Sequence, residues 1–410
     1  MTLYTAFSIL ICLTAFFAYI NNRFVKLPAT IGLMVLALIS SFVLIGIGIV
    51  NPAILEKATT YLRHFNFSEL LMGSMLSFML FAGAIHIKLE QLKQEKIPVI
   101  VFSTFSVLLS TFIIGIVTYY LLGLFNIQTN LIYCLLFGSL ISPTDPIAVL
   151  AILKEAKISP SLEMTIAGES LFNDGVAVVI FLTILQVAEQ SNSIHFTGII
   201  LLFAQEAIGG ILFGIIIGYL GLMLMREIDD YKVEVLITLA LVMGGYSLAN
   251  FLHTSGPLAM VAAGIIIGNQ GKEHAKSKKS SEYIYTFWEL LDEILNAILF
   301  VLMGLELLII HFVPVYIVIG LLMIVLVLAT RYISVFLPSQ FIKFKEKITQ
   351  RTLVILTWGG LRGGISIALA LSLQPEMQKD LWVILTYCVV TFSILVQGLT
   401  IGKLARKKSI

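Results

Sequence analysis

Long apolar runs alternate with short polar connections along the whole chain. A helix needs about 20 apolar residues to cross a bilayer, and proline, glycine or clustered charge marks the ends of each run. The pattern predicts thirteen membrane-spanning helices, at about residues 3–20, 29–50, 68–87, 97–125, 129–153, 160–189, 196–225, 232–252, 255–270, 283–311, 313–337, 349–374 and 380–402. Only His253 and Thr254 separate the eighth run from the ninth. We therefore expect an all-α, polytopic membrane protein with a single domain over residues 1–410.

Composition agrees with a membrane protein and excludes several function classes. Hydrophobic residues make up 59% of the chain and charged residues 12%, about half the charged share of soluble domains. The first run has no basic segment before it and no small-residue cleavage site, so we interpret it as a retained helix. Cys12, Cys134 and Cys388 all lie in apolar runs and predict neither disulfides nor a metal site. No P-loop, dinucleotide-binding or HExxH sequence occurs, so neither ATP-driven transport, zinc proteolysis nor a cofactor is expected.

The basic residues predict an orientation. With the N-terminus outside, 21 of the 26 Lys and Arg residues fall in cytoplasmic connections, and three fall outside. This is the bias of the positive-inside rule, and an even number of spans would remove it. We expect a multi-pass protein of the cell (inner) membrane, with residues 403–410 as a short basic cytoplasmic tail.

Two interrupted runs indicate an internal repeat. The fifth run contains SPTDP (142–146) and the twelfth contains WGGLRGG (358–364), and both compositions permit unwound backbone within a membrane. The two runs lie seven positions apart, so they are expected in opposite orientations, and such matching breaks point to a transporter's binding site. We predict inverted six-helix repeats at about 1–189 and 232–402, a linking helix at 196–225, and broken helices that cross at mid-membrane. Two unrelated kinks are the alternative.

Ionisable side chains lie within the fifth and sixth runs, where they are candidates for function. Asp145 lies between two prolines, and the sixth run contains Glu169 and Asp174. The helical period places Glu169 over Asn173 and Ser170 over Asp174, in stripes about 100° apart. Ser170 and Asp174 are therefore expected to face one cavity, while Glu169 turns to another neighbour. The alternative is a polar network that only holds helices together.

Charge balance predicts what the site binds. Arg331 and Arg362 stay charged at any relevant pH, so each is expected to neutralise one of the three acids. The third acid, which we assign as Asp174, must then be matched by a mobile cation: a proton or a metal ion, in competition. Backbone carbonyls freed by the prolines, Thr144 and the Asp145 carboxylate are hard oxygen ligands for such an ion.

Other polar residues in the runs are interpreted as structural or as lining. We interpret Glu206 and Glu306 as helix-contact or interfacial groups. His86, His253 and His311 fall near the ends of runs, where solvated histidines are ordinary. Asp292, Glu293 and Asn296 begin the tenth run and are interpreted as the lining of a cytoplasmic funnel.

Four segments carry a family resemblance: SPTDPIAV (142–149), GESLFNDGVAVVIF (168–181), FWELLDEILNAILFVLMGLEL (287–307) and WGGLRGGISIALALSL (358–373). Their order and spacing over nearly the whole chain resemble the monovalent cation:proton antiporters of the sodium/proton exchanger type, particularly the NhaP-like prokaryotic members. The resemblance implies thirteen helices in two inverted repeats, a homodimer in the membrane, and elevator-type alternating access.

The resemblance also implies roles for individual residues. Asp174 would carry the cation and the proton in turn, and Ser170, Asp145 and Thr144 would complete the coordination. Asn173 stands where electroneutral members have an asparagine. Glu169 would pair with Arg331, and Arg362 matches the arginine of the family's glycine-rich segment.

The chain departs from the family in the third run. Many relatives have an acid in an LLFEAAL-like stretch, where this chain has MLFAGAI with Ala82. The loss of a potential ligand makes potassium, or mixed sodium and potassium, a stronger expectation.

We therefore expect a secondary antiporter, not an enzyme, that exchanges Na⁺, K⁺ or Li⁺ for H⁺ one-for-one and electroneutrally, with no nucleic-acid partner. One alternative is a transporter of the same fold that carries an organic anion or another solute. The other is an intramembrane aspartyl protease with Asp145 and Asp174 as its dyad, although the chain lacks the Gly-x-Gly-Asp context.

Overall fold

Every regular element that the structure describes is helical. The computed structural model describes residues 3–63, 67–145, 149–150, 152–153, 158–189, 196–274, 278–310, 313–341 and 349–406. The expected all-α class is confirmed over these residues, because the elements they form are α-helices with short π and 3₁₀ turns.

The described helices follow the predicted runs closely. The first part of the chain contains α1 (Leu3–Ile20), the π turn η1 (Asn21–Val25), α2 (Ala29–Val50), α3 (Pro52–Arg63), α4 (Phe67–Leu70), the π turn η2 (Leu71–Met75), α5 (Leu76–Ile85), α6 (Leu89–Gln94), α7 (Lys96–Ser103), α8 (Phe105–Leu124), α9 (Leu131–Ile141) and α11 (Pro160–Glu189). The second part contains α12 (Phe196–Arg226), α13 (Tyr231–Phe251), α14 (Gly256–His274), α15 (Lys278–Glu306), α16 (Pro314–Phe341), α17 (Gln350–Trp358), α18 (Gly364–Ser372), the 3₁₀ turn η3 (Pro375–Met377), α19 (Lys379–Phe392), the π turn η4 (Ser393–Gln397) and α20 (Gly398–Ala405).

Nine helical stretches within the described ranges are long and apolar enough to cross a membrane. The other four predicted runs differ for physical reasons. The runs at 129–153 and 349–374 are broken, and the apolar part of α14 is short, Gly256–Asn269. The run at 283–311 forms α15, whose apolar part carries four acids: Glu289, Asp292, Glu293 and Glu306.

Local side-chain chemistry fixes several helix ends. The Asp230 side chain accepts a hydrogen bond from the backbone N–H of Lys232 at 2.9 Å and so caps the beginning of α13. The reversal between α13 and α14 is tight, because His253 has a left-handed φ of 53° and the N–H of Thr254 bonds to the Ala249 carbonyl at 3.0 Å. The two closely spaced runs are therefore separate helices.

One helix was not predicted. Residues of α3 were expected to form a connection, because their apolar side chains are interrupted by charge and are too few for a membrane span. The apolar residues recur instead at helical spacing, and α3 packs along α2.

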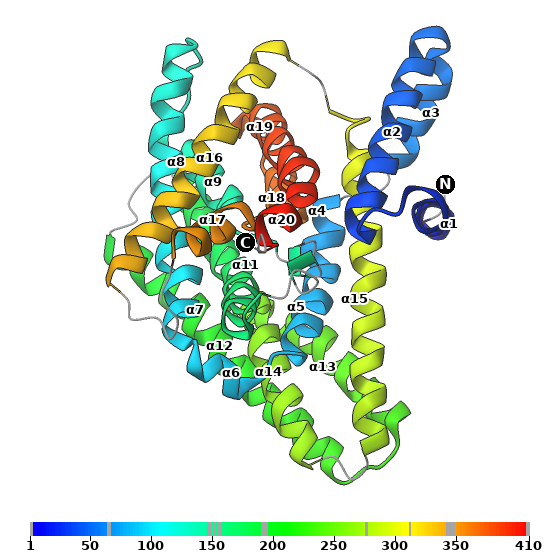
Figure 1. Cartoon of the computed structure of the whole chain (residues 1–410), viewed down its shortest axis with the longest axis vertical. Helices are drawn as coiled ribbons and strands as arrows, with labels where there is room; N and C mark the ends of the chain where they lie inside the picture. Colours follow the sequence, from blue (N-terminus) through cyan, green and yellow to red (C-terminus); the bar gives the residue numbers. More distant parts are fainter. Residues whose placement is uncertain are drawn as a thin grey trace.

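The broken helices lie in the middle of the molecule. In Figure 1, α9, α17, α18 and α20 are central, with α8 and α16 on one side and α1, α2 and α15 on the other. Direct packing joins α15 to α2 and α5, α16 to α8 and α19, and α12 to α14. Large apolar side chains are exposed on the outer helices, including Phe42, Tyr120 and Leu236 at 62%, 68% and 65%. An apolar surface of this kind is typical of lipid contact.

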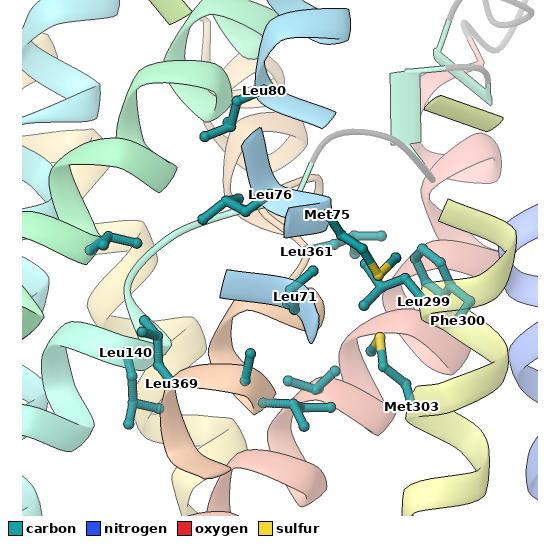
Figure 2. Close-up of a cluster of buried hydrophobic side chains, with 14 of the residues drawn as sticks. Leu71, Met75, Leu76, Leu80, Leu140, Leu299, Phe300, Met303, Leu361 and Leu369 are labelled. Atoms are coloured by element: carbon teal, nitrogen blue, oxygen red, sulfur yellow. The ribbon is translucent and has the colours of Figure 1, made fainter. Parts of the chain in front are cut away.

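A dense apolar cluster lies beside the broken helices. In Figure 2, Leu299, Phe300 and Met303 of α15 gather beside Met75 of η2 and Leu361. All five side chains are almost completely buried. The cluster therefore seals α15 against the centre of the molecule at this level.

Candidate cation-binding site

Two helix breaks meet at the centre of the molecule. The first follows α9, where Ser142–Asp145 are not helical, and the second separates α17 from α18. Proline and paired glycines interrupt the helical hydrogen bonds at these places. The backbone N–H of Asp145 donates to the Leu361 carbonyl at 2.8 Å. A backbone donor of the first break and a backbone acceptor of the second break therefore satisfy each other. Pro146, the second proline of the first break, lies outside the described residues.

Glycine is required where the breaks meet. A Cβ atom on Gly363 would lie 2.5 Å from Oδ2 of Asp145, and one on Gly360 would lie 2.7 Å from Nε of Arg331. Both distances are well inside van der Waals contact. The second break can therefore approach the Asp145 carboxylate and the Arg331 guanidinium only because these positions lack side chains.

Arg362 binds the first break through its backbone. Its guanidinium Nη1 donates to the carbonyls of Ser142 and of Pro143, the latter at 2.8 Å, and the side chain is buried. The Arg362 backbone N–H donates to Oγ of Ser393 at 2.9 Å. These hydrogen bonds of the guanidinium therefore go to backbone carbonyls, whereas the charge count predicts an acid as its partner. The prolines leave carbonyl oxygens without helical partners, and these accept the guanidinium donors instead.

Glu169 and Arg331 form a buried ion pair between α11 and α16. Nη1 of Arg331 donates to Oε1 of Glu169 at 2.5 Å. The side chain of Arg331 is 6% exposed and that of Glu169 is 2% exposed. Nη2 of Arg331 also donates to the carbonyl of Leu356, in α17, at 3.4 Å. The pair thus joins the sixth predicted run to the eleventh and twelfth.

Thr144 is held from α11 by two neighbouring side chains. Oγ of Ser170 donates to the Thr144 carbonyl, and Nδ2 of Asn173 donates to the Thr144 hydroxyl at 2.8 Å. All three residues are buried. The carbonyls of residues 142, 143 and 144 therefore already accept hydrogen bonds, so they are not the free ligands that the proline pattern predicts. Each carbonyl oxygen still keeps a second lone pair.

The two aspartates differ from this buried framework. Asp145 and Asp174 are half-buried, whereas Thr144, Glu169, Ser170 and Asn173 are buried. Their two carboxylates are close enough for the charges to repel each other. Within the described part of the chain, the Asp174 side chain forms no hydrogen bond or ion pair. The site thus presents two neighbouring, half-buried carboxylates, and neither Arg331 nor Arg362 forms an ion pair with Asp174 in the described part of the chain.

The other residues that the sequence singled out have different environments. Ala82 is buried in α5, at 1% exposed. Oε2 of Glu206 is buried without a hydrogen-bond partner among the described residues. Asp292, on α15, is half-buried, and its charge interacts with that of Asp145. His311 and residues 407–410 of the basic tail lie outside the described residues.

Sequence reasoning missed the supports supplied by η4. Besides the Ser393 contact to Arg362, Nε2 of Gln397 donates to the Trp358 carbonyl at 3.0 Å, where α17 ends. A single π turn inside an apolar run leaves no hydropathy signal. The available clue was two polar residues, Ser393 and Gln397, spaced four apart in a segment otherwise suited to lipid.

Comparisons with known proteins agree over the whole chain. A family model described as sodium/hydrogen exchanger, transmembrane, matches residues 12–407. The chain is 48% identical to the Na⁺/H⁺ antiporter NhaP of Pseudomonas aeruginosa, over 97% of this chain and 95% of that protein. It is 33% identical to the Na⁺/H⁺ antiporter NhaH of Halobacillus dabanensis, over 94% and 93%. The solved structure of the sodium proton antiporter from Methanocaldococcus jannaschii at pH 8 has the same fold, with a TM-score of 0.77 at 20% identity over 99% of each chain.

Proposed function

The chain belongs to the sodium/hydrogen exchanger family, and we propose that it exchanges one monovalent cation for one proton without net charge movement. It is a multi-pass membrane transporter rather than an enzyme. Na⁺ is the expected cation from the relatives' function, and we extend the set to K⁺ and Li⁺. K⁺ is included because Ala82 stands where many relatives have an acid in the third predicted run, which removes one charged ligand that could favour the smaller Na⁺.

The observation that carries this proposal is the pairing pattern of the charges. Arg331 is bound to Glu169 and Arg362 to backbone carbonyls, while Asp174 lies beside Asp145 with no arginine on it. Two carboxylates that repel each other in a membrane need a mobile positive charge. A proton or an alkali-metal ion on Asp174 supplies that charge, and one excludes the other.

In the proposed mechanism, Asp174 is the alternating carrier. Asp145 adds a second carboxylate ligand. Ser170 and Thr144, which are hydrogen-bonded to each other at the first break, add neutral oxygen ligands. Asn173 fixes Thr144 through its amide and adds no charge. Each crossing then carries either a cation or a proton on the same carboxylate, so the moving charge is unchanged.

We also propose the finer architecture. Each of the thirteen predicted runs overlaps at least one described helix. The contact between the breaks of the fifth and twelfth runs supports inverted repeats at 1–189 and 232–402 with α12 between them. The proposal includes an N-terminus outside the cell membrane, a cytoplasmic C-terminus, a homodimer and elevator-type alternating access.

The test is cation-dependent dequenching of a pH-sensitive dye in proteoliposomes. Wild-type chain should dequench on addition of Na⁺, K⁺ or Li⁺, and Asp174→Asn should abolish the response to all three. The control is Glu189→Gln, the same chemical change on the same helix, where the exposed side chain only accepts a hydrogen bond from Gln374. Cation-coupled proton flux that survives in Asp174→Asn would refute the assignment.

Electroneutrality is tested with a membrane potential imposed by a gradient of the permeant anion thiocyanate. One net charge moved per cycle would contribute about 2.3 kcal/mol per 100 mV. The Na⁺-dependent rate should not change with the potential. A rate that follows the potential would show that the exchange is electrogenic.

A further inference from the structure

The face of α15 that points to the centre of the molecule changes character along its length. Asp292, Asn296, Leu299 and Met303 are spaced by four, three and four residues, so they form one stripe on the helix. Leu299 and Met303 belong to the apolar cluster beside the second break (Figure 2). Asp292 and Asn296 continue the same stripe toward the beginning of α15. One face is therefore sealed by apolar side chains at one end and lined by polar groups at the other.

This stripe faces the candidate site. A Cβ on Gly364 would lie 2.7 Å from the Leu299 side chain, and the preceding residue, Gly363, contacts the Asp145 carboxylate in the same way. Asp292 lies two helical turns from Leu299 and is half-buried, and its charge interacts with that of Asp145. Asp292 therefore lies on the same helix face as Leu299, at the polar end of the stripe, and near enough to Asp145 for the two charges to interact.

Asn296 supplies a second oxygen on this stripe. Its side chain is 2% exposed, and its Nδ2 donates to the Asp292 carbonyl at 2.9 Å. Its Oδ1 is buried and has no hydrogen-bond partner among the described residues. A buried acceptor without a donor costs about 1–3 kcal/mol. Amide and carboxylate oxygens are the ligands that hard cations prefer, so a cation beside Asp292 would also satisfy Asn296.

We propose that Asp292 and Asn296 form a second, transient cation station between one aqueous side and the Asp145–Asp174 pair. The inference rests on the proposed function and adds a step to it. The ion enters from the end at which α15 begins, which the basic residues predict to be cytoplasmic. It exchanges part of its hydration for Asp292 and Asn296, and then moves to the two aspartates. The negative charge at the station raises the local cation concentration at the mouth of the site.

The first test separates apparent affinity from maximal rate. In proteoliposomes with the full chain, Asp292→Asn should raise the KM for Na⁺ about fivefold, which corresponds to about 1 kcal/mol, while the rate at saturating Na⁺ stays within about twofold. Asp292→Glu should restore most of the affinity. Glu289→Gln is the matched control, because it removes the same charge from an exposed side chain three residues earlier on the same helix, and its KM should equal that of wild type. Equal KM values for Asp292→Asn and Glu289→Gln would overturn the station.

The second test does not depend on transport. Binding of ²²Na⁺ is measured by scintillation proximity on purified chain in detergent, in an Asp174→Asn background that cannot exchange. Residual binding should persist in Asp174→Asn and should fall by at least about fivefold when Asp292→Asn or Asn296→Leu is added. Monodispersity on size-exclusion chromatography shows that each variant is folded. Binding that neither added substitution changes would refute the station. A wild-type chain that binds Na⁺ at Asp292 but does not exchange it for protons would refute only the proposed function.

Discussion

The buried ion pair of Glu169 and Arg331 predicts a measurable stability coupling. The two side chains are 2% and 6% exposed and their charged atoms lie 2.5 Å apart, so neither charge has water as an alternative partner. Removal of one member of a buried pair costs about 3–5 kcal/mol, because the other charge is left uncompensated. In Glu169→Gln the amide oxygen still accepts one hydrogen bond, and Arg331 keeps the Leu356 carbonyl. We therefore expect Glu169→Gln to lower the free energy of unfolding by about 3 kcal/mol, at the lower end of this range.

The two single variants should differ in their response to pH. An arginine stays protonated, so Glu169→Gln leaves a positive charge that no accessible pH removes. In Arg331→Met the remaining carboxylate can take up a proton, so its cost should decrease as pH falls. The double variant should be more stable than the sum of the two single losses predicts, by the coupling energy of the pair.

The assay is the free energy of unfolding from titration of purified chain out of mild detergent into SDS. Wild type, both single variants, the double variant and the Glu189→Gln control are compared at two pH values. Single variants that unfold at the same SDS fraction as wild type would refute the argument. So would losses that add without coupling, because the two charges would then not compensate each other.

Two further predictions follow from the site. Gly363→Ala should abolish exchange in the dequenching assay, because its Cβ would lie 2.5 Å from the Asp145 carboxylate. Gly244→Ala is the control and should retain exchange, because a Cβ at that position meets nothing within 4 Å. The KM for Na⁺ should rise as pH falls, toward about tenfold per pH unit, because protons occupy the carboxylate that binds Na⁺, while at alkaline pH the rate should fall for lack of protons. A KM measured across pH 6–9 that does not change would contradict a shared site.

Much of the fold could be predicted from the sequence because the bilayer imposes a single length scale on apolar helices. The ends of α1, α2 and α11 coincide with the predicted runs. Hydropathy could not predict α3, which is amphipathic, or the π turns η2 and η4, which change backbone hydrogen bonding without changing composition. The packing of α3 on α2 and the backbone pattern of the π turns are features that a scale of hydropathy does not record.

The partner of Arg362 shows where charge counting fails. Two arginines were assigned to two acids because only formal charges were counted. A guanidinium has five N–H donors and no acceptor, and the first break offers carbonyls that have lost their helical donors. Arg362 binds two of these. The sequence contained both the prolines and the arginine, but not the contact between segments more than 200 residues apart.

This correction strengthens the argument for a monovalent carrier. Glu169 and Arg331 cancel each other within one buried pair, so the charges that remain at the centre are those of Arg362, Asp145 and Asp174. The guanidinium of Arg362 stabilises the unwound backbone next to Thr144 through the carbonyls of Ser142 and Pro143. Counted as formal charges, the two ionised aspartates and Arg362 leave one excess negative charge at the centre. A single proton or a single alkali-metal ion neutralises it, while a divalent ion would leave an excess positive charge in the membrane. In the proposed mechanism, neutral occupancy is the condition under which the centre crosses the bilayer at least electrostatic cost. We therefore propose that the same charge arrangement both selects a monovalent ion and couples it to H⁺.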